Sequence, residues 1–231
     1  KASAHFEIGG SDRQAEISMI ERDIALAKEI GAAIDIQHIS TKEGVELVRE
    51  ARKCHPNIHA EATPHHFSLT EEATIAHGTL AKMNPPLRTE EDRMAIIEAL
   101  ADGTIEIIAT DHAPHSAEEK SRGLSGSAFG IVGLETSMPI IYTHLVERGI
   151  ISLERMVDAM SLAPRRLFKM GGGVIAEGER ADLLLADLDS CYTVDSAKFL
   201  SKGKSTPFEG MEVYGKCKMT MCNGNVVWED K

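Results

Sequence analysis

The side chains best suited to chemistry in this sequence are histidines and one aspartate that follow short apolar runs typical of strands. His38 ends the first such run, the segment Thr63–His66 follows the second, and Asp111 follows the third. Imidazole nitrogen and carboxylate oxygen are ligands that a divalent metal such as zinc prefers. Their clustering at strand ends predicts a metal site.

These residues depend on an alternation of strands and helices to bring them together. Strands are expected at 33–39, 57–62 and 105–110, and helices at 16–30, after a cap at Ser40–Thr41, and at 90–101, 133–147 and 152–160. Such alternation predicts parallel strands with crossover helices. In parallel α/β folds, functional groups gather at the carboxyl ends of the strands. His5, in the run Ala4–Glu7, is expected to end a further strand that starts before residue 1.

Each of these residues also has a structural interpretation. A single histidine at a strand end can be a hydrogen-bonded structural residue, and His65 and His66 can be a cap or a packing pair. Asp111 can cap a turn, and the segment Asn84–Pro86 can be a rigid turn without a ligand. Only the joint placement of several such groups favours the metal site.

The chain changes character near residue 170. From the glycine run 171–173 onward, short β runs and turns replace the strand–helix alternation, with strands expected at 181–187 and 216–222. Asn223–Gly224 predicts a hairpin turn into the run 226–228. We therefore predict a large α/β domain over 1–170 and a small β domain over 171–231.

Composition limits the classes of function. The 231 residues carry a formal net charge of −11, with 42% hydrophobic and 26% charged residues, as expected for a globular chain. The negative charge argues against a general binder of nucleic acid or of anionic membranes, and no apolar stretch is long enough to span a bilayer. Four cysteines without a CxxC pair indicate free thiols in a reducing cytoplasm.

Two motifs together resemble one enzyme family. The segments Thr110–His115 (Thr-Asp-His-Ala-Pro-His) and Met83–Arg88 (Met-Asn-Pro-Pro-Leu-Arg) closely resemble those of class I, bacterial-type dihydroorotases in the amidohydrolase superfamily. The resemblance runs nearly end to end, and further segments that carry it are His38–Thr41, Ala62–His66, Phe129–Glu135, Ala176–Leu183 and Ser201–Phe208. It implies the C-terminal part of a (β/α)8 metal-dependent hydrolase barrel, followed by a small β-sandwich domain.

The resemblance also implies roles for individual residues. His5 and His38 would be metal ligands, and Asp111 would bind the metal and act as general acid and base. Four residues would contact the substrate: Asn84, His115, and the backbone of Phe129 and Gly130. His115 would pair with a substrate carboxylate, and His65 and His66 would have a supporting role.

The implied activity is the reversible interconversion of N-carbamoyl-L-aspartate and L-dihydroorotate in pyrimidine biosynthesis, with one or two zinc ions. Two alternatives stay open: another cyclic amidohydrolase acting on hydantoin, dihydropyrimidine or allantoin, and an inactive dihydroorotase-like subunit. The family also implies a cytoplasmic homo-oligomer, and aspartate transcarbamoylase as a possible partner.

Some features of the family are absent from this sequence. The first-strand His-x-His-x-x-Arg motif and the bridging metal ligand of the fourth strand are not found, and residue 1 is not methionine. We therefore expect the barrel to be incomplete, with its first strands in a preceding segment. The segment after His5 is also about 20 residues shorter than is usual in the family, either through a true deletion or because a loop has been omitted.

Overall fold

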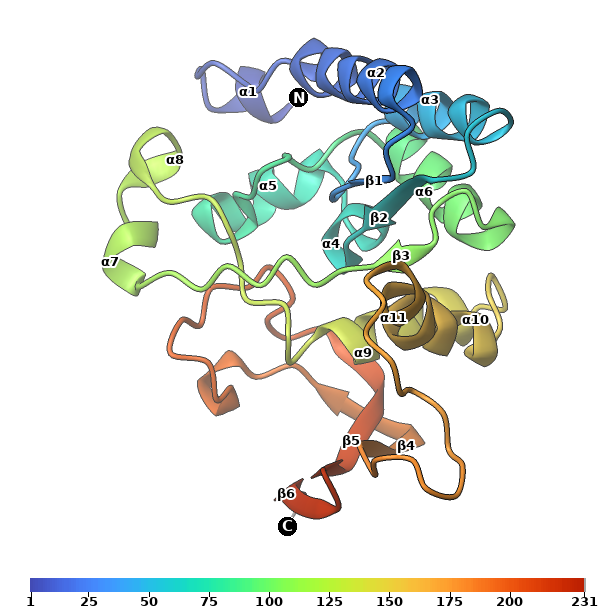
Figure 1. The fold of residues 1–231 in the computed structure, drawn as a ribbon. Helices are drawn as coiled ribbons and strands as arrows, with labels where there is room; N and C mark the ends of the chain where they lie inside the picture. Colours follow the sequence, from blue (N-terminus) through green and yellow to red (C-terminus); the bar gives the residue numbers. More distant parts are fainter. Residues whose placement is uncertain (231) are drawn as a thin grey trace. The chain divides into compact units, whose positions relative to one another are not determined.

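The computed structural model describes residues 1–230, which form two compact units (Figure 1). Unit 1 contains Lys1–Ser137 and the returning segment Asp195–Glu209. Unit 2 contains Met138–Val194 and the chain from Gly210 onward. The predicted domain boundary near residue 170 stays a prediction, since the division by internal contacts falls at other points of the chain.

Unit 1 is built on a three-stranded parallel sheet in the order β1-β2-β3 (Figure 1). Its strands are β1 (Ile34–Ile36), β2 (Ile58–Ala62) and β3 (Ile107–Ile108). The register places Asp35 beside His59 and Glu61 beside Ile107. The predicted parallel pairing is therefore confirmed, although each strand is shorter than its predicted run.

Three longer helices accompany these strands: α2 (Arg13–Ile30), α3 (Lys42–Arg52) and α6 (Glu90–Asp102). Asp12, Thr41 and Thr89 cap their first turns by accepting backbone N–H bonds, which satisfies donors that a helix leaves unpaired. The buried side chains of α3 and α6, together with alternate residues of β2, form the core: Val45, Val48, Ala51, Ile58, Ala60, Ala62, Ile96, Ile97 and Leu100.

Short elements complete unit 1. They are α1 (Ala2–His5), α4 (Pro64–Ser68), α5 (Glu71–His77), η1 (Gly78–Ala81), α7 (Ala117–Lys120), α8 (Gly123–Gly126) and η4 (Ser196–Lys198). Most of them lie in the connections that follow β2 and β3, which carry most of the predicted functional residues; His38 instead follows β1, and His5 lies in α1.

The strand predicted to end at His5 is wrong, because residues 2–5 form helix α1. The backbone N–H of His5 donates to Lys1 O at 2.9 Å, and that of Phe6 donates to Ala2 O at 3.0 Å. The Lys1 side chain binds Glu72 at 2.7 Å, which ties this helix to α5. Local helical hydrogen bonds thus replace pairing with a neighbouring strand.

Unit 2 combines a helical segment with a second sheet. Its helical turns are α9 (Ser137–Ile141), π-helical η2 (Tyr142–Val146), α10 (Leu153–Val157), π-helical η3 (Asp158–Leu162) and α11 (Ala163–Leu167). The first of these begins four residues later than the helix predicted from 133. A short backbone bridge between His112 and Ile131 lies just before that stretch.

The second sheet is antiparallel, in the order β4-β5-β6. Its strands are β4 (Leu183–Thr193), β5 (Glu212–Cys222) and β6 (Asn225–Glu229). Asn223 and Gly224 both have positive φ, 48° and 77°, which is the geometry of a tight hairpin turn. The predicted hairpin is confirmed. No helix within residues 1–230 is long and apolar enough to cross a membrane.

Candidate functional site

The carboxyl ends of the parallel strands place His38 and Asp111. Both residues have left-handed backbone geometry, with φ of 38° for His38 and 46° for Asp111. This geometry is uncommon for residues other than glycine, and it turns the chain sharply as it leaves a strand. The backbone N–H groups of Ile39 and Ala109 donate to Glu61 O and Ala62 O, both at 3.0 Å, so neighbouring strands fix these turns.

His65 joins them from the first turn of α4. Its Nε2 lies 3.9 Å from Asp111 Oδ2, and the residue is only 1% exposed. Burial lowers the pKa of His65 well below its usual value, and His66 and His38 lower it further. Burial raises the pKa of Asp111, against the opposing effect of His38. His38 is therefore close enough to influence the charge of both His65 and Asp111.

Two imidazole nitrogens in this cluster have no hydrogen-bond partner within residues 1–230. They are His38 Nδ1 and His65 Nε2, and both are buried. A buried nitrogen without a partner is costly, so it indicates a missing ligand or water. The lone pair of the His65 nitrogen and the nearby Asp111 carboxylate are groups that can bind a divalent cation. Residues 1–230 contain no group of three His, Cys, Asp or Glu side chains arranged to hold a metal, so His38, His65 and Asp111 fit only part of a ligand set.

Glu61 adds a second carboxylate beside this cluster. Burial raises its pKa to about 7, and the negative charges of Asp35 and Asp111 act in the same direction. A backbone hydrogen bond from His38 acts against them. Through this bond, and through the bond of its backbone carbonyl to the Ile39 N–H, Glu61 connects strand β2 to the turn that carries His38.

A partly buried ion pair between Glu16 and Arg88 holds the turn after His38. The Glu16 carboxylate accepts hydrogen bonds from the backbone of Ser40 and Thr41, at 2.9 and 3.1 Å. Arg88 donates to the same carboxylate at 3.2 Å and to Ser40 Oγ at 3.1 Å. Since Arg88 ends the Met83–Arg88 motif, this pair fastens that motif to the strand end.

His66 faces a different environment from His65. Thr63 Oγ1 donates to His66 Nδ1 at 2.8 Å, and His66 Nε2 donates to Pro85 O at 3.0 Å. Burial lowers the pKa of His66 to about 4, so it is neutral at pH 7. Both ring nitrogens are occupied, and the residue links α4 to Pro85, whose peptide bond with the exposed Asn84 is cis.

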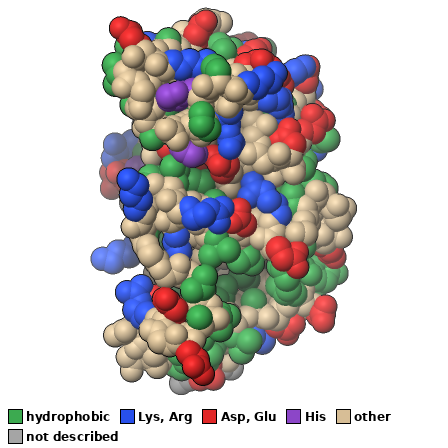
Figure 2. All heavy atoms as spheres, turned by 45° about the vertical axis from the view of Figure 1, so that its right-hand side comes forward, with side chains coloured by type: hydrophobic (Ala, Val, Ile, Leu, Met, Phe, Trp, Pro, Cys, Tyr) green, Lys and Arg blue, Asp and Glu red, His purple; other side chains and the backbone are tan. Residues whose placement is uncertain are grey.

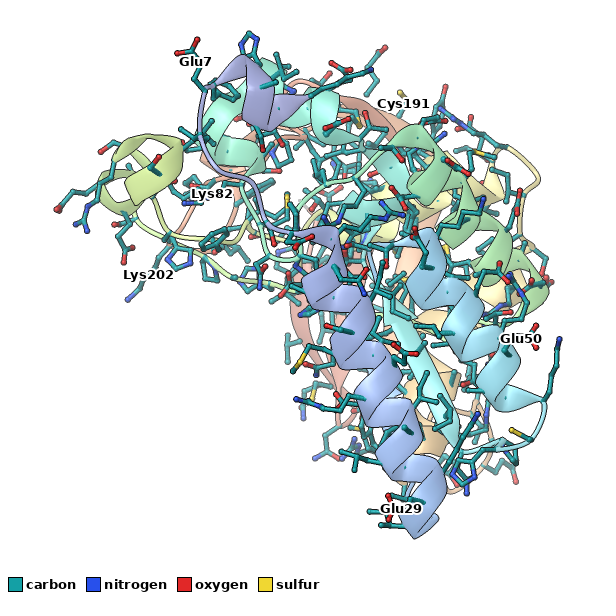
Figure 3. All side chains as sticks on the ribbon, turned by 90° about the horizontal axis from the view of Figure 1, so that it is seen from above. Glu7, Glu29, Glu50, Lys82, Cys191 and Lys202 are labelled. Carbon is teal, nitrogen blue, oxygen red and sulfur yellow. The ribbon has the colours of Figure 1, made fainter. Side chains whose placement is uncertain are left out.

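A second group of predicted residues meets around His115. His115 Nε2 donates to Phe129 O at 2.8 Å, and its Nδ1 lies 3.6 Å from Glu119 Oε2. The Gly130 N–H donates to Lys82 O at 3.0 Å, and Lys82 Nζ lies 4.1 Å from the centre of the Phe129 ring. Lys82, labelled in Figure 3, directly follows η1 in the sequence. His115, Phe129 and Gly130 are therefore neighbours, and their contacts with substrate stay a prediction.

Two glycines allow these loops to approach closely. Gly130 has φ of 127°, and a Cβ there would lie 2.5 Å from Ala113 Cβ and 2.9 Å from Ala113 O. A Cβ on Gly203 would lie 2.8 Å from Pro114 Cβ and 2.9 Å from the backbone N and O of His115. The returning segment Asp195–Glu209 therefore packs directly on the loop after β3.

His112 has a supporting position between the two groups. Its Nδ1 accepts hydrogen bonds from the backbone N–H of Gly133 at 3.0 Å and of Leu134 at 3.3 Å. With both N–H groups directed at Nδ1, the ring proton must lie on Nε2. His112 thus fastens the loop after β3 to the segment that follows Gly130.

The structure does not bring His5 to His38 and Asp111. His5 is an exposed residue of α1, and Figure 3 shows Glu7, two residues further on, pointing outward from the N-terminal segment. Its role as a metal ligand stays a prediction. The sequence predicts only a supporting role for His65, and Lys120 is not among the predicted residues. The Thr63–His66 motif carried a signal for His65, whereas Lys120, within a charged run, carried none.

The chain is similar to proteins of a known family. Residues 10–227 match the model of the amidohydrolase family. The chain is 44% identical over its full length to the dihydroorotase of Clostridium acetobutylicum, covering 54% of that protein, and 46% identical over 228 residues to that of Clostridioides difficile, again covering 54%. The chain thus spans about half the length of these relatives.

Solved structures give the same result. The L-hydantoinase from Arthrobacter aurescens matches 92% of this chain with a TM-score of 0.87 and 36% identity, over 48% of its own length. The dihydropyrimidinase from Brevibacillus agri matches 94% with a TM-score of 0.89 and 28% identity, over 49% of its length. The resemblance noted from the motifs is confirmed, and the chain belongs to the amidohydrolase family.

Proposed function

We propose that this chain is part of a dihydroorotase that reversibly interconverts N-carbamoyl-L-aspartate and L-dihydroorotate. The observation that carries the proposal is His65 Nε2, which is buried, has no hydrogen-bond partner within residues 1–230 and lies 3.9 Å from Asp111 Oδ2, together with the likewise buried and unpartnered Nδ1 of His38. Such a cluster suits a cation and a proton carrier. The dihydroorotases that the chain resembles along its length make this reaction the best candidate.

Amidohydrolases are in general metal-dependent, and zinc is the ion that we propose here, one or two per chain. His38, Asp111 and the predicted ligand His5 would contribute to its binding, with His65 beside them. When bound, zinc supplies a Lewis acid and lowers the pKa of water. Asp111 would accept the proton that the attacking water loses and return it to the leaving ring nitrogen. His65, kept neutral by burial, would not compete for that proton.

Asn84, His115, Phe129 and Gly130 would hold the substrate. The His115 ring would pair with a substrate carboxylate, and the backbone of Phe129 and Gly130 would bind the ring amide. The Gly130 N–H and the Phe129 carbonyl already have partners inside the protein, Lys82 O and His115 Nε2. Substrate would therefore share or exchange these bonds rather than meet free groups.

The same proposal extends to the whole protein. The sheet β1-β2-β3 would belong to the later part of a (β/α)8 barrel, and β4-β5-β6 to a small β-sandwich domain, with the boundary near residue 170. We propose a cytoplasmic homo-oligomer that could also associate with aspartate transcarbamoylase. An inactive dihydroorotase-like subunit stays the structural alternative.

A second candidate is a hydantoinase or dihydropyrimidinase. The similarity to the L-hydantoinase structure, at 36% identity, favours it. Turnover of L-dihydroorotate and of hydantoin by the complete protein separates the two, since the proposed enzyme should act on the first far faster. Failure to turn over dihydroorotate would contradict the proposed reaction. Metal analysis that finds less than about half an equivalent of zinc per chain would contradict the proposed zinc site.

The role of Asp111 is tested by Asp111→Asn in the complete protein. An amide cannot carry the proton, so kcat should fall by about three orders of magnitude or more while the unfolding midpoint changes little. Asp23→Asn, at a half-buried position of α2, is the matched control and should keep full activity. Activity above a tenth of the parent value in Asp111→Asn would exclude the proton-carrier role.

A further inference from the structure

Lys120, the last residue of α7, is a buried lysine whose hydrogen-bond partners are all backbone carbonyls. It is 2% exposed, and its Nζ donates to Gly130 O at 2.9 Å, Ala128 O at 3.0 Å and Lys82 O at 3.2 Å. No acidic side chain within residues 1–230 pairs with it. An ammonium group held in this way uses all three of its N–H donors.

Such an arrangement is costly for a residue with only a scaffold role. Burial and the nearby charge of Lys82 together lower the pKa of Lys120 to about 8. A buried charge without a counter-ion destabilises the fold unless its hydrogen bonds compensate. The three carbonyls come from two separate chain segments, so the bonds fasten those segments to each other and to α7.

Both segments belong to the proposed substrate site. Phe129 lies between the two carbonyls of the first segment, and Asn84 lies two residues after Lys82 in the second. Lys82 O accepts from both Lys120 Nζ and the Gly130 N–H, so it joins the two segments at one atom.

Helix α7 links the same lysine to His115. Ser116 caps this helix, and its N–H and Oγ donate to Glu119 Oε2 at 2.8 and 2.9 Å. That oxygen lies 3.6 Å from His115 Nδ1. The Ala128 N–H donates to Glu119 O at 3.3 Å. Helix α7 therefore fixes the His115 ring, the predicted carboxylate-binding group, at its start. At its end it fixes the Phe129–Gly130 backbone.

We propose that Lys120 is a positioning residue for substrate binding: its ammonium group holds the Phe129–Gly130 backbone and the Lys82–Asn84 segment in the geometry that binds the ring amide. This inference rests on the proposed function. It assigns Lys120 no contact with substrate and no part in proton transfer.

The test compares Lys120→Met with Lys28→Met in the complete, metal-loaded protein. Methionine keeps the length and the apolar character of the side chain but donates no hydrogen bond, and Lys28 is an exposed residue of α2 that serves as the matched control. Hydrogen exchange of the backbone amides of residues 126–132 and 82–84 should become faster in Lys120→Met, with exchange in α2 and α3 unchanged. KM for L-dihydroorotate should rise about tenfold or more, with kcat within about threefold of the parent value.

The outcomes separate the possibilities. Unchanged exchange in both segments, or faster exchange without a rise in KM, would overturn the positioning role. If kcat and the free energy of unfolding both fall while KM stays constant, Lys120 is a scaffold residue, and this result would also overturn the positioning role. If Lys120→Met does not fold, Lys120→Gln, which keeps an N–H donor, provides the same comparison with smaller expected changes. If the parent protein itself does not turn over dihydroorotate, the proposed function fails, while the exchange experiment still decides whether Lys120 holds the two segments.

Discussion

At the scale of single residues, neighbouring histidines have different environments. His66 has both ring nitrogens occupied, by Thr63 and Pro85, whereas His65 Nε2 and His38 Nδ1 have no partner within residues 1–230. Both His65 and His66 have lowered pKa values because of burial. A neutral imidazole with a free lone pair can bind a metal, while a neutral imidazole with two bonds holds a loop.

His115→Ala tests the proposed carboxylate contact. Removing the ring deletes the hydrogen bond to Phe129 O and the proposed partner of the substrate, so KM for L-dihydroorotate should rise between about tenfold and a hundredfold, with a smaller change in kcat. Steady-state kinetics of the complete protein measure this. His77→Ala, at the end of α5, is the control. An unchanged KM would show that His115 does not bind substrate.

At the scale of elements, helix α6 begins with a capping box that is joined to two other helices. The Asp92 carboxylate accepts from Thr89 Oγ1 at 2.6 Å, from the Lys42 N–H at 2.9 Å and from Arg13 Nη1 at 2.8 Å. The Asp92 carboxylate thus connects the starts of α2, α3 and α6. Burial by itself would raise the pKa of Asp92, but these hydrogen bonds lower it to about 2.

This low pKa predicts a pH-dependent contribution to stability. Because the folded-state pKa lies below the unfolded value of 3.8, the contribution is present above about pH 4 and is lost as the pH falls toward 2. Asp92→Asn should therefore lower the free energy of unfolding by about 2 kcal/mol at pH 7, and by less at pH 3. Urea unfolding at both pH values measures this, with the exposed Glu91→Gln as control. If the loss of unfolding free energy in Asp92→Asn is the same at both pH values, the ionised form of Asp92 is not what stabilises the fold.

The returning segment Asp195–Glu209 supports the loop after β3. Glu135 accepts the backbone N–H groups of Leu200 and Ser201 at 2.8 and 3.0 Å, and the Val132 N–H donates to Ser205 O at 2.9 Å. Gly203 then meets the His115 backbone. A chain segment remote in sequence thus limits the position of a predicted substrate residue.

Gly203→Ala should disturb this contact. An added Cβ would lie within 3 Å of Pro114 and of the His115 backbone, so one of the two segments must move. We expect a loss of about 1–3 kcal/mol in the free energy of unfolding and a higher KM. Gly9→Ala is the matched control, because a Cβ there would meet no atom within 4 Å. Equal stability of the two variants would show that the close approach is not important.

At the scale of the whole molecule, the distribution of apolar side chains differs between the units. Exposed apolar residues are frequent in unit 2, in particular Leu183, Leu184 and Leu185 on β4 and Val226, Val227 and Trp228 on β6. Figure 2 shows one face, with charged side chains of both signs between hydrophobic ones. Within residues 1–230, strands β4 and β6 are the edges of their sheet, so unpaired backbone and apolar side chains occur together.

Leu184→Lys should reduce aggregation. A charge on an edge strand opposes pairing with another chain, and the 56% exposed side chain contributes little to the core. The temperature at which light scattering appears should rise, with the free energy of unfolding within about 0.5 kcal/mol of the parent value. Leu184→Ile is the control that keeps the apolar surface. If both variants scatter light like the parent protein, β4 does not drive association.

The sequence by itself determined the local elements and the order of the functional groups along the chain. Helices α2, α3 and α6 follow from caps and apolar periodicity, and the hairpin follows from Asn223–Gly224, because these signals act within a few residues. The motifs with Asn84 and Asp111 were also sufficient to indicate the family.

Only the tertiary structure decided which groups meet. Burial separates the roles of His65 and His66, and the carbonyls around Lys120 come from segments more than 30 residues apart in sequence. The residues around His5 form a helix rather than the predicted strand, because pairing depends on a neighbouring strand and helical bonds depend only on local residues. Contacts between remote segments leave no periodic pattern in a single sequence. The sequence therefore places the site at the strand ends but does not show which side chains contact one another there.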